Sequence, residues 1–351
     1  MRTQRGFSVV ELMVAMTISL LLLAGGVSVM YTSRLTYDEN SRVARLQEYA
    51  RASMEIMLRD LRGAGHPGCA RAVDGSRFTN SLSNSTALRY NFGVAVQGYE
   101  GTSGTFSPTL PTTVIPSATT QNDVLVTRTA VDDMQVFRTR TAFAGGTGSI
   151  EINKRNGQEI PLGTVLLVSD CDYASIFTNT TAVASSGTQA TLDRGTGALT
   201  PPAGMAQMPQ NGSVSFPAYP ADSWVSALQT VIYYIRPSAS GSGPALWRIV
   251  GNAEPQELVE GVERMEIQYG VDTNDDLLVD AYQTASAVTD WAQVLSVSLA
   301  VLIRSPEQSA DASPNARTFN MLGTTVGPFS DKRPRILFTT TVALRNRATT
   351  I

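Results

Sequence analysis

The stretch RGFSVVELMVAM, residues 5–16, opens a long apolar run. A short basic leader, residues 1–6, precedes the run, and no residue from 12 to 33 carries a charge. About 20 consecutive apolar residues are enough for a helix to span a bilayer, so the sequence predicts a transmembrane helix over residues 7–33. Positive charge before a span stays on the cytoplasmic side, so the rest of the chain is expected on the opposite side.

Glu11 is a carboxylate near the start of this apolar run. An unpaired carboxylate in hydrocarbon costs several kcal/mol, so one interpretation places it near the interface, where it reaches water. A second interpretation gives it a partner. If the chain were cut after Gly6, Phe7 would carry a cationic amine, and a second copy alongside could bring that amine to Glu11. A later cut at the small residues 24–26 is the alternative of an ordinary secretory signal.

The segment GFSVVELMVAM resembles the class III signal of type IV prepilins and pseudopilins. That signal has a short basic leader ending in glycine, then phenylalanine, then an acid at the fifth mature position. The matching residues here are Gly6, Phe7 and Glu11. The resemblance implies cleavage between Gly6 and Phe7 by a prepilin peptidase, followed by N-methylation of Phe7. It also implies that Glu11 pairs with an N-terminal amine during assembly.

The helical pattern continues beyond the apolar run. Residues 34–62 contain no proline or glycine, and apolar side chains recur there at steps of three and four. This predicts one helix from Phe7 to about Arg62, on the order of 80 Å long, whose second half packs on a globular head. A coiled coil is the alternative for that half. Gly25–Gly26 is the expected place for a bend or local melting. The predicted stripe is Val43, Leu46, Ala50, Met54, Met57 and Leu61.

The remaining sequence favours short strands separated by turns, which predicts an α+β fold with a mostly antiparallel β head. Two stretches, 79–121 and 178–222, are expected to be surface loops because Ser, Thr and other turn residues dominate them. The head covers 63–351 and divides into two subdomains, if at all, near 200–225. The predicted strands are 123–129, 134–139, 164–169, 231–235, 246–249, 262–271, 295–303 and 336–344.

Composition excludes several classes of function. The formal net charge is -3, and only 16% of residues are charged, so nucleic acid is not an expected partner. One histidine and two cysteines are too few for the usual zinc or iron–sulfur sites. His66 lies in the glycine-rich turn after the helix, away from any nucleophile pattern. We therefore expect no enzyme activity, with a membrane-anchored periplasmic enzyme as the alternative.

Further blocks along the chain resemble the PilW family of minor pilins, and the J-type pseudopilin of type II secretion is the nearest competitor. The resemblance implies a minor pilin in the bacterial inner membrane, with a single span and a periplasmic head, that enters the pilus and sits at its tip. Implied partners are other minor pilins, the major pilin, the prepilin peptidase, the assembly platform, a tip adhesin and the lipid bilayer. The blocks are 58–69, 168–177, 257–282, 291–305 and 338–347.

Cys69 and Cys171 are the two cysteines. A head in an oxidising periplasm would allow one disulfide between them. In the chain-entropy model, closing a loop of about a hundred residues is worth roughly 4.7 kcal/mol. The bond would tie the exit of the long helix to the β head. Two free buried thiols are the alternative.

The segment DTNDDLLVD, residues 272–280, places oxygen-bearing side chains at alternate positions. Asp272, Asn274, Asp276 and Asp280 match positions 1, 3, 5 and 9 of a calcium-binding loop. Leu277 stands where that loop has its turn glycine, and Gln283 stands where it has its bidentate glutamate. An acidic β-turn is the alternative, because Asn and Asp side chains bond to nearby backbone in turns. Both a Ca²⁺ site and a plain turn remain open at this point.

Overall fold

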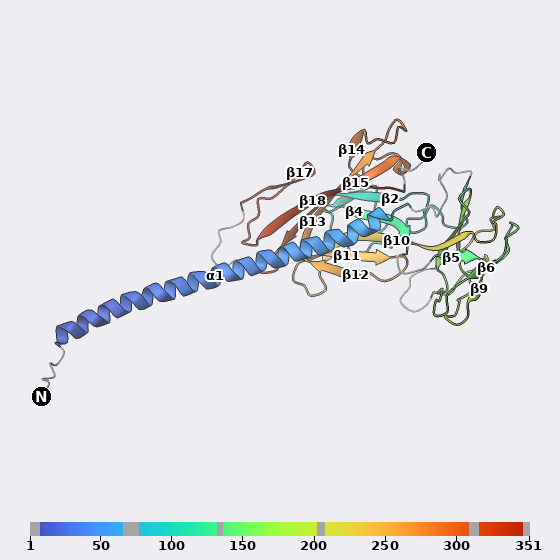
Figure 1. Ribbon diagram of the computed structural model, residues 1–351. Helices are drawn as coiled ribbons and strands as arrows, with labels where there is room; N and C mark the ends of the chain where they lie inside the picture. The colour runs from blue at the N-terminus through green and yellow to red at the C-terminus, as the bar shows by residue number, and fades with distance from the viewer. Residues whose placement is uncertain (1–7, 66–76, 132–135, 202–207, 309–315, 347–351) are drawn as a thin grey trace.

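A computed structural model describes residues 8–65, 77–131, 136–201, 208–308 and 316–346. A long helix, α1 (Val9–Arg62), leads into a head whose regular elements are strands and one short 3-10 helix (Figure 1). The first half of α1 extends away from the head, and the second half lies along it. This arrangement confirms the predicted α+β class.

Helix α1 has a defined cap at each end. Ser8 is the N-cap, and Gly63 is the C-cap, with its backbone N–H donating to the carbonyls of Arg59 and Leu61. The helix continues without interruption through Gly25 and Gly26, where the sequence predicted a bend or local melting. An α-helix saturates its own backbone hydrogen bonds, so two glycines in one long helix need not break it.

The larger sheet has twelve strands and follows the order β1-β8-β7-β10-β4-β2-β3, with two branches from β10. One branch adds β11 and β12, and the other adds β5, β6 and β9. All of its pairs are antiparallel except β1 with β8. The strands are β1 (Phe78–Asn80), β2 (Val96–Thr102), β3 (Thr105–Ser107), β4 (Val124–Ala130), β5 (Phe137–Thr139), β6 (Ile150–Asn153), β7 (Val165–Ser169), β8 (Ala174–Thr178), β9 (Gln189–Leu192), β10 (Trp224–Pro237), β11 (Pro244–Val250) and β12 (Gln256–Glu260).

The second sheet has four antiparallel strands in the order β14-β13-β15-β18. A separate hairpin, β16 with β17, lies beside it. A short 3-10 helix, η1, precedes β15. Their bounds are β13 (Val262–Val271), β14 (Ala281–Gln283), η1 (Trp291–Gln293), β15 (Val294–Arg304), β16 (Phe319–Met321), β17 (Thr324–Val326) and β18 (Arg335–Ala343).

The main core joins the second half of α1 to both sheets. Five of the six predicted stripe residues are buried, and Val43, the one nearest the free half, is 36% exposed. The helix packs against β18, β15, β12 and β4, which excludes an isolated coiled-coil segment. The buried stripe residues are Leu46, Ala50, Met54, Met57 and Leu61.

The eight predicted strands all overlap observed strands, although the predicted 231–235 covers only part of β10. Residues 134 and 135 of one predicted strand lie outside the described residues. The two predicted surface loops were wrong in part. Stretch 79–121 contains β2 and β3, and stretch 178–222 contains β9. Strand β2 is rich in Gly and polar residues, yet it pairs along β4, so tertiary pairing overrides its weak intrinsic preference.

The strands β5, β6 and β9 and the loops joining them form what we call the distal lobe. It lies at the end of the head furthest from the N-terminus (Figure 1). It has its own hydrophobic cluster, which includes Phe137, Ile152, Phe177 and Phe216. Strand β10 pairs with β5 at one end and with β11 at the other, so it connects the lobe to the rest of the sheet. Of the stretch 200–225, residues 208–223 lead into β10, and residues 202–207 lie outside the described residues.

Candidate functional site

The start of α1 uses Glu11 as a capping residue. Ser8 N–H donates to Glu11 Oε2 at 3.2 Å, and Val10 N–H donates to Ser8 Oγ at 3.3 Å. This is a capping box, which satisfies backbone donors that the first helical turn leaves without partners. Gly6 and Phe7 lie outside the described residues, so the predicted cleavage and the pairing of Glu11 with an amine stay predictions.

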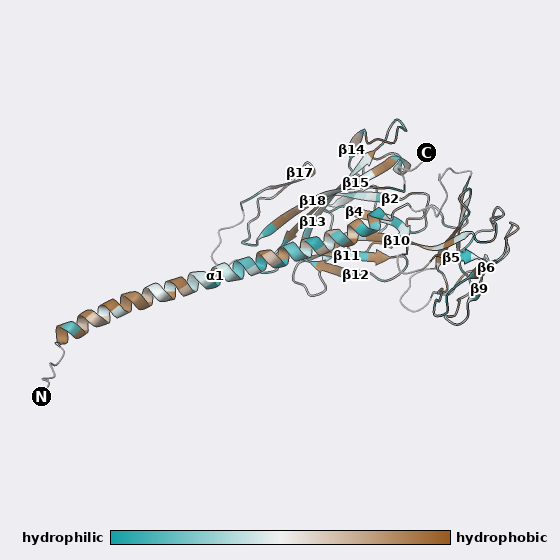
Figure 2. Ribbon diagram, viewed as in Figure 1, coloured by the Kyte–Doolittle hydropathy of each residue, from teal (hydrophilic) through white to brown (hydrophobic). Residues whose placement is uncertain are grey.

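The first half of α1 is mostly hydrophobic (Figure 2), and its large apolar side chains from Val9 to Tyr31 are exposed. It is long and apolar enough to cross a membrane, and its most apolar stretch has no contact with the head. Its hydroxyl groups bond within the helix: Thr17 Oγ1 donates to the Val14 carbonyl, and Thr32 Oγ1 to the Ser28 carbonyl. A surface of this size is stable only when a bilayer or similar helices remove it from water.

The second half of α1 holds a buried acid. Asp60 is 5% exposed, and its Oδ2 accepts a hydrogen bond of 2.5 Å from Tyr233 Oη on β10. Tyr233 is fully buried, and burial together with the neighbouring carboxylate raises the pKa of its hydroxyl. The pair therefore fixes the end of the helix to the central strand of the larger sheet.

The exit of α1 is held closely against β4. A Cβ on Gly63 would lie 2.4 Å from Thr129 Oγ1, so only glycine allows this approach. Ala64 forms a bridge with Thr129, and Gly65 N–H donates to the Arg128 carbonyl at 2.8 Å. The last two contacts join backbone groups, so the path of the chain from the end of α1 into the head is fixed within a few residues.

Comparison with known protein families finds matches in two separate parts of the chain. Residues 1–27 match the sequence profile of the prokaryotic N-terminal methylation motif. Residues 232–346 match the profile of PilW, described as type IV pilus-assembly protein W. The two matches together support a type IV pilin of the PilW family. No curated protein and no solved structure matches the chain.

The PilW match begins inside β10 and covers β11 to β18, so it contains the whole four-stranded sheet on which α1 packs. Of the five blocks that resembled the family, 257–282 and 291–305 lie fully inside it, and 338–347 does so except for its last residue. Blocks 58–69 and 168–177 fall outside the match. The distal lobe is also outside it.

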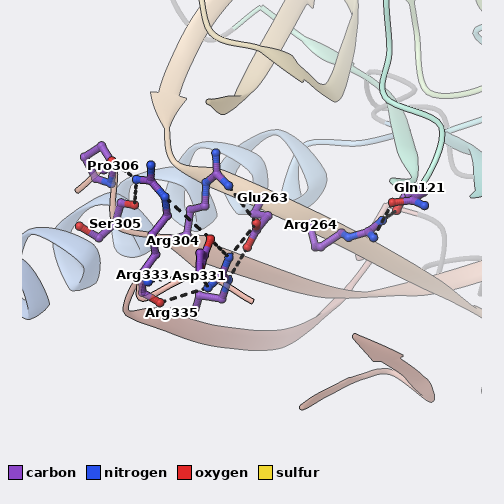
Figure 3. A network of polar contacts seen from close by, with 9 residues as sticks. All are labelled: Gln121, Glu263, Arg264, Arg304, Ser305, Pro306, Asp331, Arg333 and Arg335. Atoms are coloured by element: carbon purple, nitrogen blue, oxygen red, sulfur yellow. Dashed lines mark hydrogen bonds and ion pairs between the residues drawn. The ribbon is translucent and has the colours of Figure 1, made fainter. Parts of the chain in front are cut away.

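A network of charged side chains stabilises one end of the four-stranded sheet, β14-β13-β15-β18 (Figure 3). Arg335, with its side chain 1% exposed, donates to Glu263 at 2.6 Å and to Asp331 at 2.6 Å. Arg304 bonds to the same Glu263 at 3.2 Å. Hydrogen bonds from Arg335 hold the pKa of Asp331 below its ordinary value. Removing either carboxylate would leave the buried Arg335 charge partly unpaired, so both partners are needed. Because Glu263 lies on β13, Arg304 on β15 and Arg335 on β18, these ion pairs favour one alignment of the three strands.

The same end of the sheet is connected to the helix. Arg42 on α1 forms two ion pairs. Its Nε lies 3.5 Å from Glu307 Oε2, and its Nη1 lies 3.5 Å from Glu39 Oε2. Arg333 donates to the carbonyls of Ser305 and Pro306, which lie directly before Glu307. These contacts therefore link the segment just before β18 to the loop after β15, and that loop to Arg42 on α1.

A buried acid joins the two sheets. Asp123 Oδ1 accepts from Gly101 N–H at 2.9 Å, and Oδ2 accepts from Ile267 N–H on β13 at 2.7 Å. Burial raises the pKa of Asp123 to about 8, with a further contribution from Glu266, while the two backbone hydrogen bonds oppose the shift. Burial likewise raises the pKa of Glu266 to about 7. The carboxyl groups of Asp123 and Glu266 at this junction therefore gain and lose their protons near neutral pH.

Of the two cysteines, the structure describes Cys171. Cys171 lies in the turn between β7 and β8, with a positive φ of 75°. Cys69 lies outside the described residues. The disulfide between them stays a prediction.

The acidic segment 272–280 forms the loop between β13 and β14. Asp272 is 3% exposed and accepts hydrogen bonds from the backbone N–H groups of Asn274, Asp276 and Leu277. Asp280 accepts two hydrogen bonds from Thr273. Among the described residues, no group of three or more His, Cys, Asp or Glu side chains is placed to hold a metal. The side-chain bonds to backbone that the acidic-turn interpretation expects are present, but the segment is a nine-residue loop and not a β-turn. The Ca²⁺ prediction stays untested.

Sequence reasoning missed the buried polar groups that position the helix and the sheets. Asp60 gave a signal, because an acid adjoins Leu61 on the predicted apolar stripe. Arg335 gave none, since an arginine at a strand start is usually solvated. Asp123 was included in a predicted strand, but nothing in the sequence places it against β13.

Proposed function

We propose that this pilin is a minor subunit that joins other minor pilins in a complex that primes pilus assembly, and that it occupies the tip. The single observation that carries the proposal is the contrast between a fully exposed apolar half-helix and a large head docked on the other half. Burying the apolar half among similar helices would drive assembly. A head of this size fits poorly into the repeated packing of a thin filament, which favours low copy number.

The proposal includes the localisation and the partners. Before assembly, the apolar half lies in the bacterial inner membrane and the head is periplasmic; afterwards the subunit is part of the pilus. Its partners are other minor pilins, the major pilin, the prepilin peptidase, the assembly platform and a tip adhesin. The chain serves as a substrate of processing enzymes and has no catalytic role of its own. Adhesion and twitching motility are the cellular functions that such a subunit supports.

Processing is tested on the mature N-terminus. Mass spectrometry of the chain from host membranes, with and without the prepilin peptidase, should give an N-methylated Phe7 peptide that the peptidase mutant lacks. A chain that begins at Met1 in both strains, or one cut near residues 24–26, contradicts the proposal.

Assembly is tested with a matched pair of variants. Glu11→Gln removes the carboxylate at the helix start, while Glu48→Gln removes one from an exposed position on the docked half. We expect the first to lower the amount of subunit in sheared pili at least tenfold and the second to leave it unchanged. Equal recovery of both variants contradicts a role for Glu11 in assembly.

Tip placement and the type of filament are tested by location and partners. Gold labelling of a tagged head should mark filament ends, and crosslinking should recover minor pilins. Labelling along the whole filament contradicts a tip position. Crosslinks to components of a type II secretion system instead would identify the J-type pseudopilin alternative.

A further inference from the structure

The distal lobe carries a surface that the pilin function does not explain. Strands β5, β6 and β9 bury one face against the lobe's hydrophobic cluster and leave the other face open. This lobe lies at the end of the head opposite the membrane helix (Figure 1), so its open face is far from the assembly interface.

The register of the strands aligns four side chains in one row across the open face. Trp224 on β10 is opposite Arg138 on β5, Arg138 is opposite Asn153 on β6, and Asn153 is opposite Gln189 on β9. Residues paired in this way point to the same side of a sheet. The row therefore presents an aromatic ring, a guanidinium and two amides next to one another.

A hollow of about 660 Å³ lies beside this row and is lined by three cations. Arg138 lies over the Trp224 ring, with 3.9 Å between its Cζ and the ring centroid, and donates to the Asp222 carbonyl at 2.8 Å. Lys154 is 7% exposed, and its Nζ donates to two backbone carbonyls at 3.0 Å. The hollow is lined by Val136, Arg138, Asn153, Lys154, Arg155 and Gln158.

None of the described residues that line the hollow is acidic. Glu151, which lies two residues before Asn153 on the same face of β6, is bound to Arg140 at 2.8 Å, and Arg140 also donates to Gln189. Arg138 and Lys154 are held by carbonyl groups, which do not neutralise their charge. Arg155 is exposed at the rim. The described lining residues therefore give the hollow three positive charges, and it is open to solvent.

We propose that this surface binds an acidic glycan, with a carboxylate or phosphate group in the cationic hollow. A guanidinium held in one position binds oxyanions through paired hydrogen bonds. The amides of Asn153 and Gln189 offer donors and acceptors for sugar hydroxyls. Trp224, which is 37% exposed, offers the part of its ring that Arg138 does not cover to the apolar side of a sugar.

Binding is measured on the full chain in detergent by titration calorimetry. The probes are an oligogalacturonate, a phosphorylated oligomannose and neutral maltohexaose. The test variant is Arg138→Gln with Arg155→Gln, and the matched control is Arg51→Gln, an exposed arginine on α1. The single variant Arg155→Gln, at an exposed site, guards against loss of folding, which thermal melting checks for every variant.

We expect at least one anionic glycan to bind, the double variant to bind it at least tenfold more weakly, and Arg51→Gln to match the native chain. Binding of the uronate alone identifies carboxylate as the group recognised, and binding of the phosphorylated glycan alone identifies phosphate. The proposal is overturned if neither anionic glycan binds, if maltohexaose binds equally well, or if the double variant is unaffected. Equal binding of linear polyphosphate would overturn glycan recognition in favour of simple charge attraction.

Discussion

Tyr233 Oη donates a hydrogen bond of 2.5 Å to Asp60 Oδ2, across the interface between the docked helix and strand β10. The two residues are far apart in sequence and both are buried. The helix of this pilin is thus attached to its head by specific polar contacts as well as by apolar packing.

Replacing Tyr233 with Phe should destabilise the head. The variant keeps the ring packed but removes the donor to a buried carboxylate, which costs about 2 kcal/mol. Urea unfolding of the full chain in detergent measures the loss. The control is Tyr37→Phe, since Tyr37 is 74% exposed on the free side of α1. Equal midpoints for the two variants would show that the contact contributes nothing.

The stability of the head should fall as pH rises from about 4 to about 8. The pKa of Asp123 is raised to about 8 in the folded chain, so the folded state keeps a proton that the unfolded state has lost above its ordinary pKa. Stability is therefore greatest below the unfolded pKa and is lost as pH rises through the folded pKa. Glu266, raised to about 7, acts in the same direction.

Asp123→Asn tests this dependence directly. An amide does not ionise, so the melting temperature should vary less between pH 4 and pH 8 than in the native chain, although the variant loses one acceptor for a backbone N–H. Asp38→Asn, at an exposed helix position, is the control and should keep the native slope. A native slope in Asp123→Asn would mean that other groups cause the pH dependence.

Arg335→Ala should destabilise the four-stranded sheet. The change leaves Glu263 and Asp331 without their shared cation in a half-buried site, at a cost of about 3 kcal/mol. Hydrogen exchange of β13 and β18 should rise more than that of the distal lobe. Arg45→Ala, on the exposed face of α1, is the comparison. Unchanged exchange in β18 would refute the structural role of Arg335.

The predicted disulfide between Cys69 and Cys171 is tested by peptide mapping. A crosslinked peptide should be present in the unreduced digest and absent after reduction, and Cys171→Ser should lower stability by up to about 4 kcal/mol. Alkylation of both thiols in denaturant without reductant would exclude the bond.

Asp272→Ala should destabilise the loop after β13 by about 2 kcal/mol in calcium-free buffer, because Asp272 accepts three backbone N–H groups. Calorimetric titration of the native chain with Ca²⁺ tests the metal prediction separately. Heat that Asp276→Asn abolishes would support a metal site, and no heat would leave the segment as a turn.

The helix and most of the longer strands could be predicted because their apolar periodicity is local. Val262–Val271 was predicted with its observed bounds, and the buried stripe of α1 was predicted except at its Val43 end. Strand β2 was missed because its Gly and polar residues give little strand preference, and pairing with β4 decides its conformation. The distal row was missed for a different reason: Trp224, Arg138, Asn153 and Gln189 are distant in sequence, and only the register brings them together.

Strand β10 also has a mechanical consequence. It contacts the anchored end of α1 through Tyr233 and continues to the distal lobe through Trp224, so one strand joins the two regions (Figure 1). Tension applied between the lobe and the membrane end of the helix would be carried along this strand. Its hydrogen bonds to neighbouring strands lie across that direction and would be loaded in shear, many at once, instead of opening one after another. A subunit built in this way should resist pulling better than its equilibrium stability alone would indicate.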